Sequence, residues 1–142
     1  MKIEKTSYKD IKDFNKEEWR DADREHYGKD LDWDKEWKVR KIILKAVDDG
    51  KLVGALKLQI ECGVAKIDTI IVTKAKRNIG IGKQLMLAAE NAVKKRGCHK
   101  IWLETGKGWS AISLYESMGY EKVADLPKHY FKKNFILLSK FI

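Results

Sequence analysis

The chain has 142 residues, of which 44% are hydrophobic and 36% are charged, and its formal net charge is +9. This length predicts a single domain over residues 1–142, and the composition is too apolar for a disordered chain. No apolar run approaches the roughly 20 residues of a membrane span, no apolar segment of the secretory type opens the chain, and two cysteines far apart exclude a disulfide scaffold, so we expect a cytoplasmic protein without membrane contact.

The first half of the chain predicts helices followed by strands. Ser7 and Asp10 are typical of a helix start, and Gly28 is expected to divide residues 6–38 into two short helices. Apolar, β-branched segments at residues 41–47, 51–60 and 64–72 predict three strands. Their short connections, Asp48-Asp49-Gly50 and Glu61-Cys62-Gly63, favour tight turns. These strands should therefore form an antiparallel meander.

The second half alternates between the two kinds of element. Apolar residues at helical spacing predict an amphipathic helix over residues 83–96, which Gly97 ends. A strand at 99–105, a helix at 110–118 and strands at 121–126 and 134–142 follow. Because strand 99–105 comes after a crossover helix, it should run parallel to strand 64–72. The fold class is α+β, with one mixed, mostly antiparallel sheet flanked by helices.

Basic residues are concentrated in the C-terminal part of the chain. Residues 1–40 carry 11 basic and 12 acidic side chains, whereas residues 41–142 carry 19 basic and nine acidic ones. A solvated basic surface explains this surplus. An anionic ligand, either nucleic acid or a phosphorylated cofactor, explains it equally well, and composition does not choose between them.

A glycine-rich loop, Arg77-Asn78-Ile79-Gly80-Ile81-Gly82-Lys83, connects the third strand to the helix at 83–96. Glycines permit close approach of the backbone to a ligand. The first helical turn offers unpaired N–H groups at the positive end of the helix dipole. With the charges of Arg77 and Lys83, the loop predicts a phosphate or pyrophosphate site. The spacing fits neither GxxxxGK[ST] nor GxGxxG, and a helix start without a ligand is the alternative.

Two segments carry a family resemblance. Arg77-x-x-Gly80-x-Gly82 resembles the [QR]xxGx[GA] signature of the GNAT superfamily, the acyl-CoA-dependent N-acyltransferases. Residues 111–120, AISLYESMGY, are similar to the AxxLYEKxGF end of a helix in that family. The resemblance covers about residues 40–142, and residues 1–39 fit the variable N-terminal helices of the family.

The resemblance implies an acetyl-CoA co-substrate in a V-shaped cleft between the parallel strands 64–72 and 99–105. No metal is implied. Tyr115 matches the tyrosine that protonates the leaving CoA thiolate, and the attacking amine needs no enzyme nucleophile. Backbone groups would hold the acyl and pantetheine arm at Ile70, Ile71 and Val72. The loop would hold the pyrophosphate through Arg77, Asn78, Ile79, Gly80, Ile81, Gly82 and Lys83.

The amine must lose a proton, so the mechanism needs a base or an ordered water chain. Asp68 is the first candidate, because period-2 spacing from Ile70 places it on the strand face of the cleft. Glu104, at the end of the neighbouring strand, is the second. Both carboxylates have the alternative of a solvated or salt-bridged sheet edge.

The chain also departs from the family pattern. Gly108 stands where many members have asparagine, so that Ser110 either supplies a substitute hydroxyl to CoA or caps the helix. Lys66 stands where some members carry a catalytic glutamate. Trp109 and the pair His129-Tyr130 are candidates for the acceptor pocket, with packing as the alternative.

The combined interpretation is an acetyl-CoA-dependent N-acetyltransferase acting on a primary amine of a small molecule, peptide or protein. A non-catalytic acyl-CoA-binding module is one alternative. A basic nucleic-acid-binding protein is a weaker one, because no recognition helix or base-stacking surface is evident. Dimers are common in the family, which leaves a homodimer open.

Overall fold

A computed structural model describes all of residues 1–142. The chain divides into two compact units, residues 1–38 and residues 39–142. The expectation of one domain over residues 1–142 stays a prediction.

The first unit consists of helices α1 (Tyr8–Tyr27) and α2 (Trp33–Glu36). Ser7 and Asp10 form a capping box at the start of α1, and Gly28 ends the helix in the left-handed conformation, which glycine adopts without strain. The indole N–H of Trp33 donates to the buried carboxylate of Asp23 at 2.8 Å. The predicted division near Gly28 is confirmed, but α1 is a 20-residue helix and not a short one, and α2 is a single turn.

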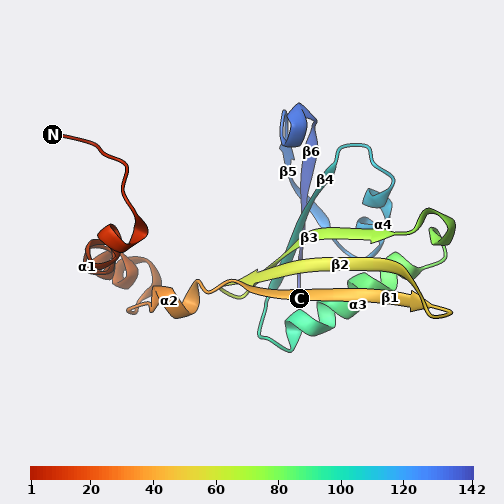
Figure 1. Cartoon of the computed structure of the whole chain (residues 1–142), viewed down its shortest axis with the longest axis horizontal. Helices are drawn as coiled ribbons and strands as arrows, with labels where there is room; N and C mark the ends of the chain where they lie inside the picture. The colour runs from red at the N-terminus through yellow and green to blue at the C-terminus, as the bar shows by residue number, and fades with distance from the viewer. The chain divides into compact units, whose positions relative to one another are not determined.

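The second unit is built on one six-stranded sheet with the order β1-β2-β3-β4-β6-β5. Neighbouring strands are antiparallel except β3 and β4, which are parallel (Figure 1). The predicted fold class and the predicted parallel pair are confirmed. The strands are β1 (Arg40–Asp48), β2 (Lys51–Glu61), β3 (Val64–Val72), β4 (Lys100–Gly106), β5 (Glu121–Leu126) and β6 (Phe135–Phe141).

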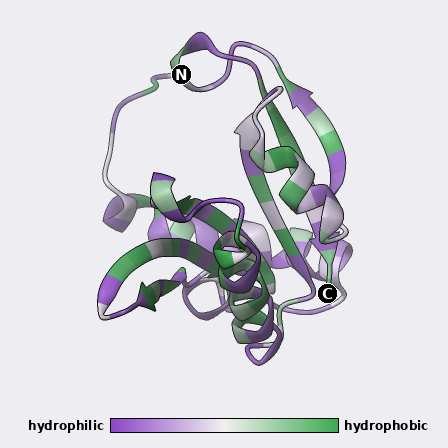
Figure 2. Ribbon diagram, turned by 90° about the vertical axis from the view of Figure 1, so that its right-hand side faces the viewer, coloured by the Kyte–Doolittle hydropathy of each residue, from purple (hydrophilic) through white to green (hydrophobic).

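Two helices and two short 3₁₀ turns connect these strands. Helix α3 (Ile81–Lys94) packs on the β1–β3 half of the sheet, and α4 (Ala111–Ser117) follows β4. The 3₁₀ turns are η1 (Lys74–Lys76) and η2 (Tyr130–Lys132). Polar and apolar residues alternate along the strands and helices (Figure 2), so that the apolar ones meet between α3 and the sheet in a core that includes Leu56, Met86, Val93, Ile101 and Leu138.

One charged pair also connects α3 to the sheet. The ammonium group of Lys140 on β6 donates to both carboxylate oxygens of Glu90 on α3, at 3.0 and 2.9 Å. Glu90 is buried and Lys140 is partly exposed. A buried carboxylate left without its partner is strongly destabilising, so the pair favours this position of α3 against the sheet.

None of the helices is both long enough and apolar enough to cross a bilayer.

Strand β3 contains a β-bulge at Asp68. Leu58 on β2 pairs with Ile67, but the preceding Lys57 pairs with Thr69, so Asp68 has no partner on β2. Ile67 and Ile70 both belong to the core although they are three residues apart. A bulge adds one residue and interrupts the alternation of faces. The regular period-2 spacing assumed between Asp68 and Ile70 is therefore interrupted by the bulge.

Candidate active-site cleft

The cleft begins where the parallel strands separate. Pairing between β3 and β4 runs only from Val64 with Lys100 to Ile67 with Leu103, although β3 continues to Val72 and β4 to Gly106. A bulge bends its strand, and the bulge of β3 lies at the end of this pairing. A cavity of about 1300 Å³ opens between the diverging strand ends. The predicted V-shaped cleft is present.

The edge of β3 that faces the cleft carries unpaired backbone groups. The N–H of Thr73 donates to the carbonyl of Val53 on β2 at 2.8 Å, so the carbonyl of Val72 in the same peptide unit points to the opposite edge. There it accepts a hydrogen bond from Nε of Arg77 at 3.0 Å. Alternation along a strand then assigns the backbone groups of Ile70 to the cleft edge and those of Ile71 to β2.

The glycine-rich loop forms the basic end of the cavity. Gly80 has φ 95°, a conformation that costs residues with a Cβ considerable strain. The first backbone hydrogen bond of α3 runs from Gln84 to Gly80, so the amides of Ile81, Gly82 and Lys83 have no acceptor inside the helix. The charged side chains at this end are Lys76, Arg77 and Lys83. Free amides beside three cations suit a pyrophosphate.

Tyr115 on α4 belongs to both the core and the cavity. Its side chain is only 5% exposed and packs edge-on against Tyr120, yet it lines the cavity, and it makes no side-chain hydrogen bond within the protein. Burial raises the pKa of the Tyr115 hydroxyl. The hydroxyl is therefore protonated at neutral pH and held in place by packing.

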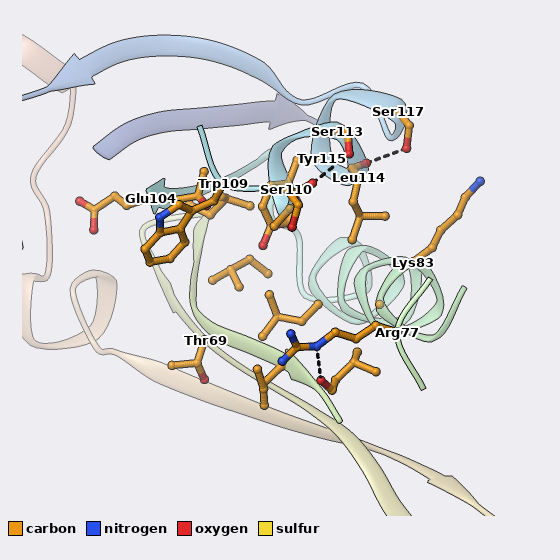
Figure 3. Close-up of a pocket in the computed structure, with 18 of the residues that line it drawn as sticks. Thr69, Arg77, Lys83, Glu104, Trp109, Ser110, Ser113, Leu114, Tyr115 and Ser117 are labelled. Carbon is orange, nitrogen blue, oxygen red and sulfur yellow. Dashed lines mark hydrogen bonds between the residues drawn. The ribbon is translucent and has the colours of Figure 1, made fainter. Parts of the chain in front are cut away.

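Helix α4 also presents three serines to the cavity. Ser113 donates to the carbonyl of Ser110 at 2.9 Å, and Ser117 donates to that of Leu114 at 2.7 Å (Figure 3). Both hydroxyl protons are therefore engaged in hydrogen bonds to backbone carbonyls of the same segment. The side chain of Ser110 makes no capping hydrogen bond, so capping does not explain this residue and its hydroxyl is available to a ligand.

Glu104 lies at the opposite end of the cavity from Lys83 (Figure 3). Its carboxylate accepts a hydrogen bond from Tyr130 at 2.6 Å and lies 3.5 Å from Nζ of Lys66. Nε2 of His129 is 3.4 Å away. Burial by itself would raise the pKa of Glu104, but the Tyr130 hydrogen bond and the charges of Lys66 and His129 outweigh it and lower the pKa. Glu104 is therefore an ionised, weakly basic group.

The cavity brings together most of the residues proposed from the sequence. Asp68, Glu104, Tyr115 and Ser110 line it, as do Ile70, Ile71, Val72, Arg77, Asn78, Gly80, Gly82 and Lys83. Ile79 and Ile81 are not among the lining residues. Sequence reasoning missed several that are, namely Thr69, Lys76, Ser113, Ser117 and Phe135. The spacing of Ser110, Ser113 and Ser117 on one helix face was a signal that could have found the serines.

No group of three or more histidine, cysteine, aspartate or glutamate side chains lies close enough to hold a metal ion. The site therefore consists of backbone amides, hydroxyls, two carboxylates and a basic end. Such an arrangement can bind a long anionic molecule, orient a carbonyl beside β3, and hand a proton to a leaving group.

Known proteins share this sequence pattern and this fold. The model of the acetyltransferase (GNAT) family matches residues 8–120. A [ribosomal protein bS18]-alanine N-acetyltransferase from Haemophilus influenzae is 29% identical over 94 residues, which cover 66% of this chain and 64% of that enzyme. The chain thus spans less than two thirds of the length of this relative.

Solved structures agree with the fold. An acetyltransferase from Bacillus cereus superposes with a TM-score of 0.70 at 19% identity, and the alignment covers 100% of this chain and 98% of that one. A GNAT family acetyltransferase from Elizabethkingia anophelis, solved with acetyl-CoA bound, gives a TM-score of 0.66 at 19% identity and covers 70% and 75% of the two chains.

Proposed function

This chain belongs to the GNAT acetyltransferase family, and from that membership we propose that it transfers the acetyl group of acetyl-CoA to a primary amine. One observation carries the proposal: a single cavity joins the free amides at the start of α3, the unpaired edge of β3 and the hydroxyl of Tyr115. A pyrophosphate, a pantetheine arm and a thioester require these three kinds of group in that order.

The residues present fit acetyl-CoA. The amides of Gly82 and Lys83 and the cations Arg77 and Lys83 would hold the pyrophosphate, while the β3 edge at Ile70 would pair with the pantetheine amides as a strand pairs. The hydroxyl of Ser110 takes the place of the asparagine that Gly108 replaces. The bound molecule supplies an activated acetyl thioester, and the fold of a relative solved with acetyl-CoA supports this assignment.

Two side chains transfer protons in this proposal, and a third binds the amine. Asp68 lines the cavity, and we assign it the proton of the incoming amine. Tyr115 gives its proton to the departing thiolate, because its raised pKa keeps the hydroxyl protonated. Glu104 has a lowered pKa and three polar neighbours, which makes it a poor base and better suited to hold the amine as an ammonium ion.

The chemical class of the acceptor amine is a further part of the proposal. The Haemophilus relative is named for acetylating an alanine of a ribosomal protein, which supports the α-amine of a protein or peptide as one class of acceptor. Small-molecule amines remain the other class. A homodimer and a cytoplasmic location stay predictions from the sequence.

Thermal unfolding with and without acetyl-CoA tests the proposal. A ligand at about 100 times its dissociation constant adds roughly 2.7 kcal/mol to the stability of the folded state, which is a shift of several degrees for a domain of this size. ATP at the same concentration and salt is the control, because it has phosphates but no pantetheine arm. Thiol release on addition of a panel of amines then measures the transfer itself.

Each outcome has a definite meaning. Stabilisation by acetyl-CoA, little by ATP, and thiol release with amines would support the proposal. Stabilisation without thiol release for any amine would favour an acyl-CoA-binding module. Equal stabilisation by ATP, or none by either ligand, would contradict the proposed cofactor site.

A further inference from the structure

The end of the cavity around Glu104 has an aromatic wall. The ring of Trp109 lies against Gly106 of β4, where any Cβ would overlap it. Phe135 lies next to Trp109 with ring centroids 5.5 Å apart, and Tyr130 meets Phe135 edge-on at 5.3 Å. All three rings line the cavity. Trp109 nevertheless remains 59% exposed, so part of its ring is available to contact a ligand in the cavity.

Glu104 places a negative charge beside this wall. Its side chain is 13% exposed, and one oxygen already receives the hydroxyl of Tyr130. A carboxylate flanked by aromatic faces binds an ammonium group through both ion pairing and cation–π attraction. The carboxylate already lies 3.5 Å from Nζ of Lys66 and 3.4 Å from Nε2 of His129, so these groups oppose any positive charge beyond a single ammonium group. This end of the cavity therefore suits a ligand with one ammonium group attached to a flat or apolar group.

A second hollow adjoins the aromatic wall. It has a volume of about 450 Å³ and is lined by Lys107, Trp109, Lys133 and Asn134. The backbone N–H of Lys107 donates to the carbonyl of Asn134 at 3.0 Å, which brings the two lysines to one place. Lys107 is 3.6 Å from Asp125, whereas Lys133 has no acidic partner. The hollow thus offers positive charge on the other side of Trp109.

We propose that the acceptor is a primary amine on an aromatic body that also carries a negative charge. Its ammonium group binds at Glu104, its ring packs on Trp109, and its anionic group reaches Lys107 and Lys133. The charge of the whole unit agrees, since residues 39–142 hold 20 basic and nine acidic side chains. Polycationic amines should be poor acceptors for the same reason. This inference rests on the proposed acetyl transfer and names its substrate class.

Three amines that differ only in the para substituent test the proposal. Benzylamine has none, 4-(aminomethyl)benzoate adds a negative charge, and 1,4-bis(aminomethyl)benzene adds a positive one. Thiol release at low salt should give kcat/KM in the order carboxylate, unsubstituted, diamine, with about tenfold between the first two. Since surface charges cause the preference, 0.5 M salt should reduce it. Equal values for the three amines, or the reverse order, would overturn the proposal.

Single-residue variants identify which side chains cause the preference among these amines. Lys133→Gln should lower the carboxylate-to-benzylamine ratio about two- to fivefold, whereas Lys94→Gln, the same charge change at the far end of α3, should leave it unchanged. Trp109→Ala should raise KM for all three aromatic amines relative to propylamine. The matched control is Phe131→Ala, because Phe131 is 95% exposed and outside the cavity. An unchanged ratio in Lys133→Gln would refute the role of the hollow.

The two proposals fail in different ways. If no amine releases thiol and acetyl-CoA does not stabilise the protein, the proposed function fails. If amines are acetylated without regard to their ring or charge, the acetyltransferase remains and only this substrate class is wrong.

Discussion

Nε of Arg77 donates a hydrogen bond to the carbonyl of Val72 at 3.0 Å, and this bond fastens the glycine-rich loop to the strand that forms one wall of the cleft. Arg77 therefore has two roles. Its charge lies at the basic end of the cavity, and its hydrogen bond fixes the distance between the loop and the β3 edge.

Replacing Arg77 should weaken cofactor binding. Loss of a charge-assisted hydrogen bond costs about 1.5–3 kcal/mol, so Arg77→Leu should raise the dissociation constant of acetyl-CoA about 10- to 100-fold in calorimetry. Arg77→Gln, which keeps an N–H donor for Val72, should lose less. If both variants bind acetyl-CoA as tightly as the unchanged protein, the loop does not hold the pyrophosphate.

Removing the hydroxyl of Tyr115 should affect turnover alone. General acid catalysis contributes about 10²- to 10⁴-fold, so Tyr115→Phe should lower kcat at least about 100-fold with little change in KM for acetyl-CoA. Because that hydroxyl makes no hydrogen bond in the protein, the melting temperature should stay within about 1 °C. Normal turnover in Tyr115→Phe would remove the tyrosine from the mechanism.

The stability of the protein should depend on the ionisation of Glu104. Its pKa is lowered in the folded state, after the opposing effect of burial, by Tyr130 and the charges of Lys66 and His129. A carboxylate with a lowered folded pKa contributes stability above its unfolded pKa, about 4.3 for glutamate. That contribution disappears as the pH falls through the folded pKa.

Urea unfolding at pH 7, 5 and 3 measures this effect. The stability difference between the unchanged protein and Glu104→Gln should be largest at pH 7, remain at pH 5 and shrink towards pH 3. A difference that stays constant over this range would mean that the carboxylate is not stabilised by its neighbours.

The Glu90–Lys140 pair should contribute measurably to stability. Glu90 is buried and Lys140 is partly exposed, so Glu90→Ala should cost about 2 kcal/mol, between the values for exposed and buried pairs. Glu90→Gln, which retains an acceptor, should cost less. The control is Lys122→Ala, which removes an exposed ion pair with Asp125 and should cost under about 0.5 kcal/mol. Equal costs for Glu90→Ala and Lys122→Ala would contradict the structural role.

Local signals in the sequence predicted the elements well. Gly28, Gly97 and the alternation of apolar residues depend on a few neighbouring positions, so the predicted strand 121–126 coincides with β5, and helix 83–96 is shifted by two residues from α3. The loop and Tyr115 were found because their motifs are contiguous.

Contacts between distant residues were not predictable in this way. Tyr130 meets Glu104 across 26 positions, and three residues near it, Lys128, Phe131 and Lys132, adopt positive φ, which side-chain patterns do not indicate. The bulge at Asp68 arises from the pairing of β3 with β2, which one strand's sequence does not reveal. The aromatic wall likewise depends on the glycine at position 106 of another strand.

The extra residue of β3 affects which substitutions and deletions this strand can accept. Substitution at Asp68 alters one side chain, but deletion of that single position would restore regular alternation from Ile67 onwards. Thr69 and Ile71 would stay on the exposed face and Ile70 and Val72 on the core face, but β3 would lose the bulge that bends it at the end of its pairing with β4. The length of this strand should therefore tolerate less variation than its composition does.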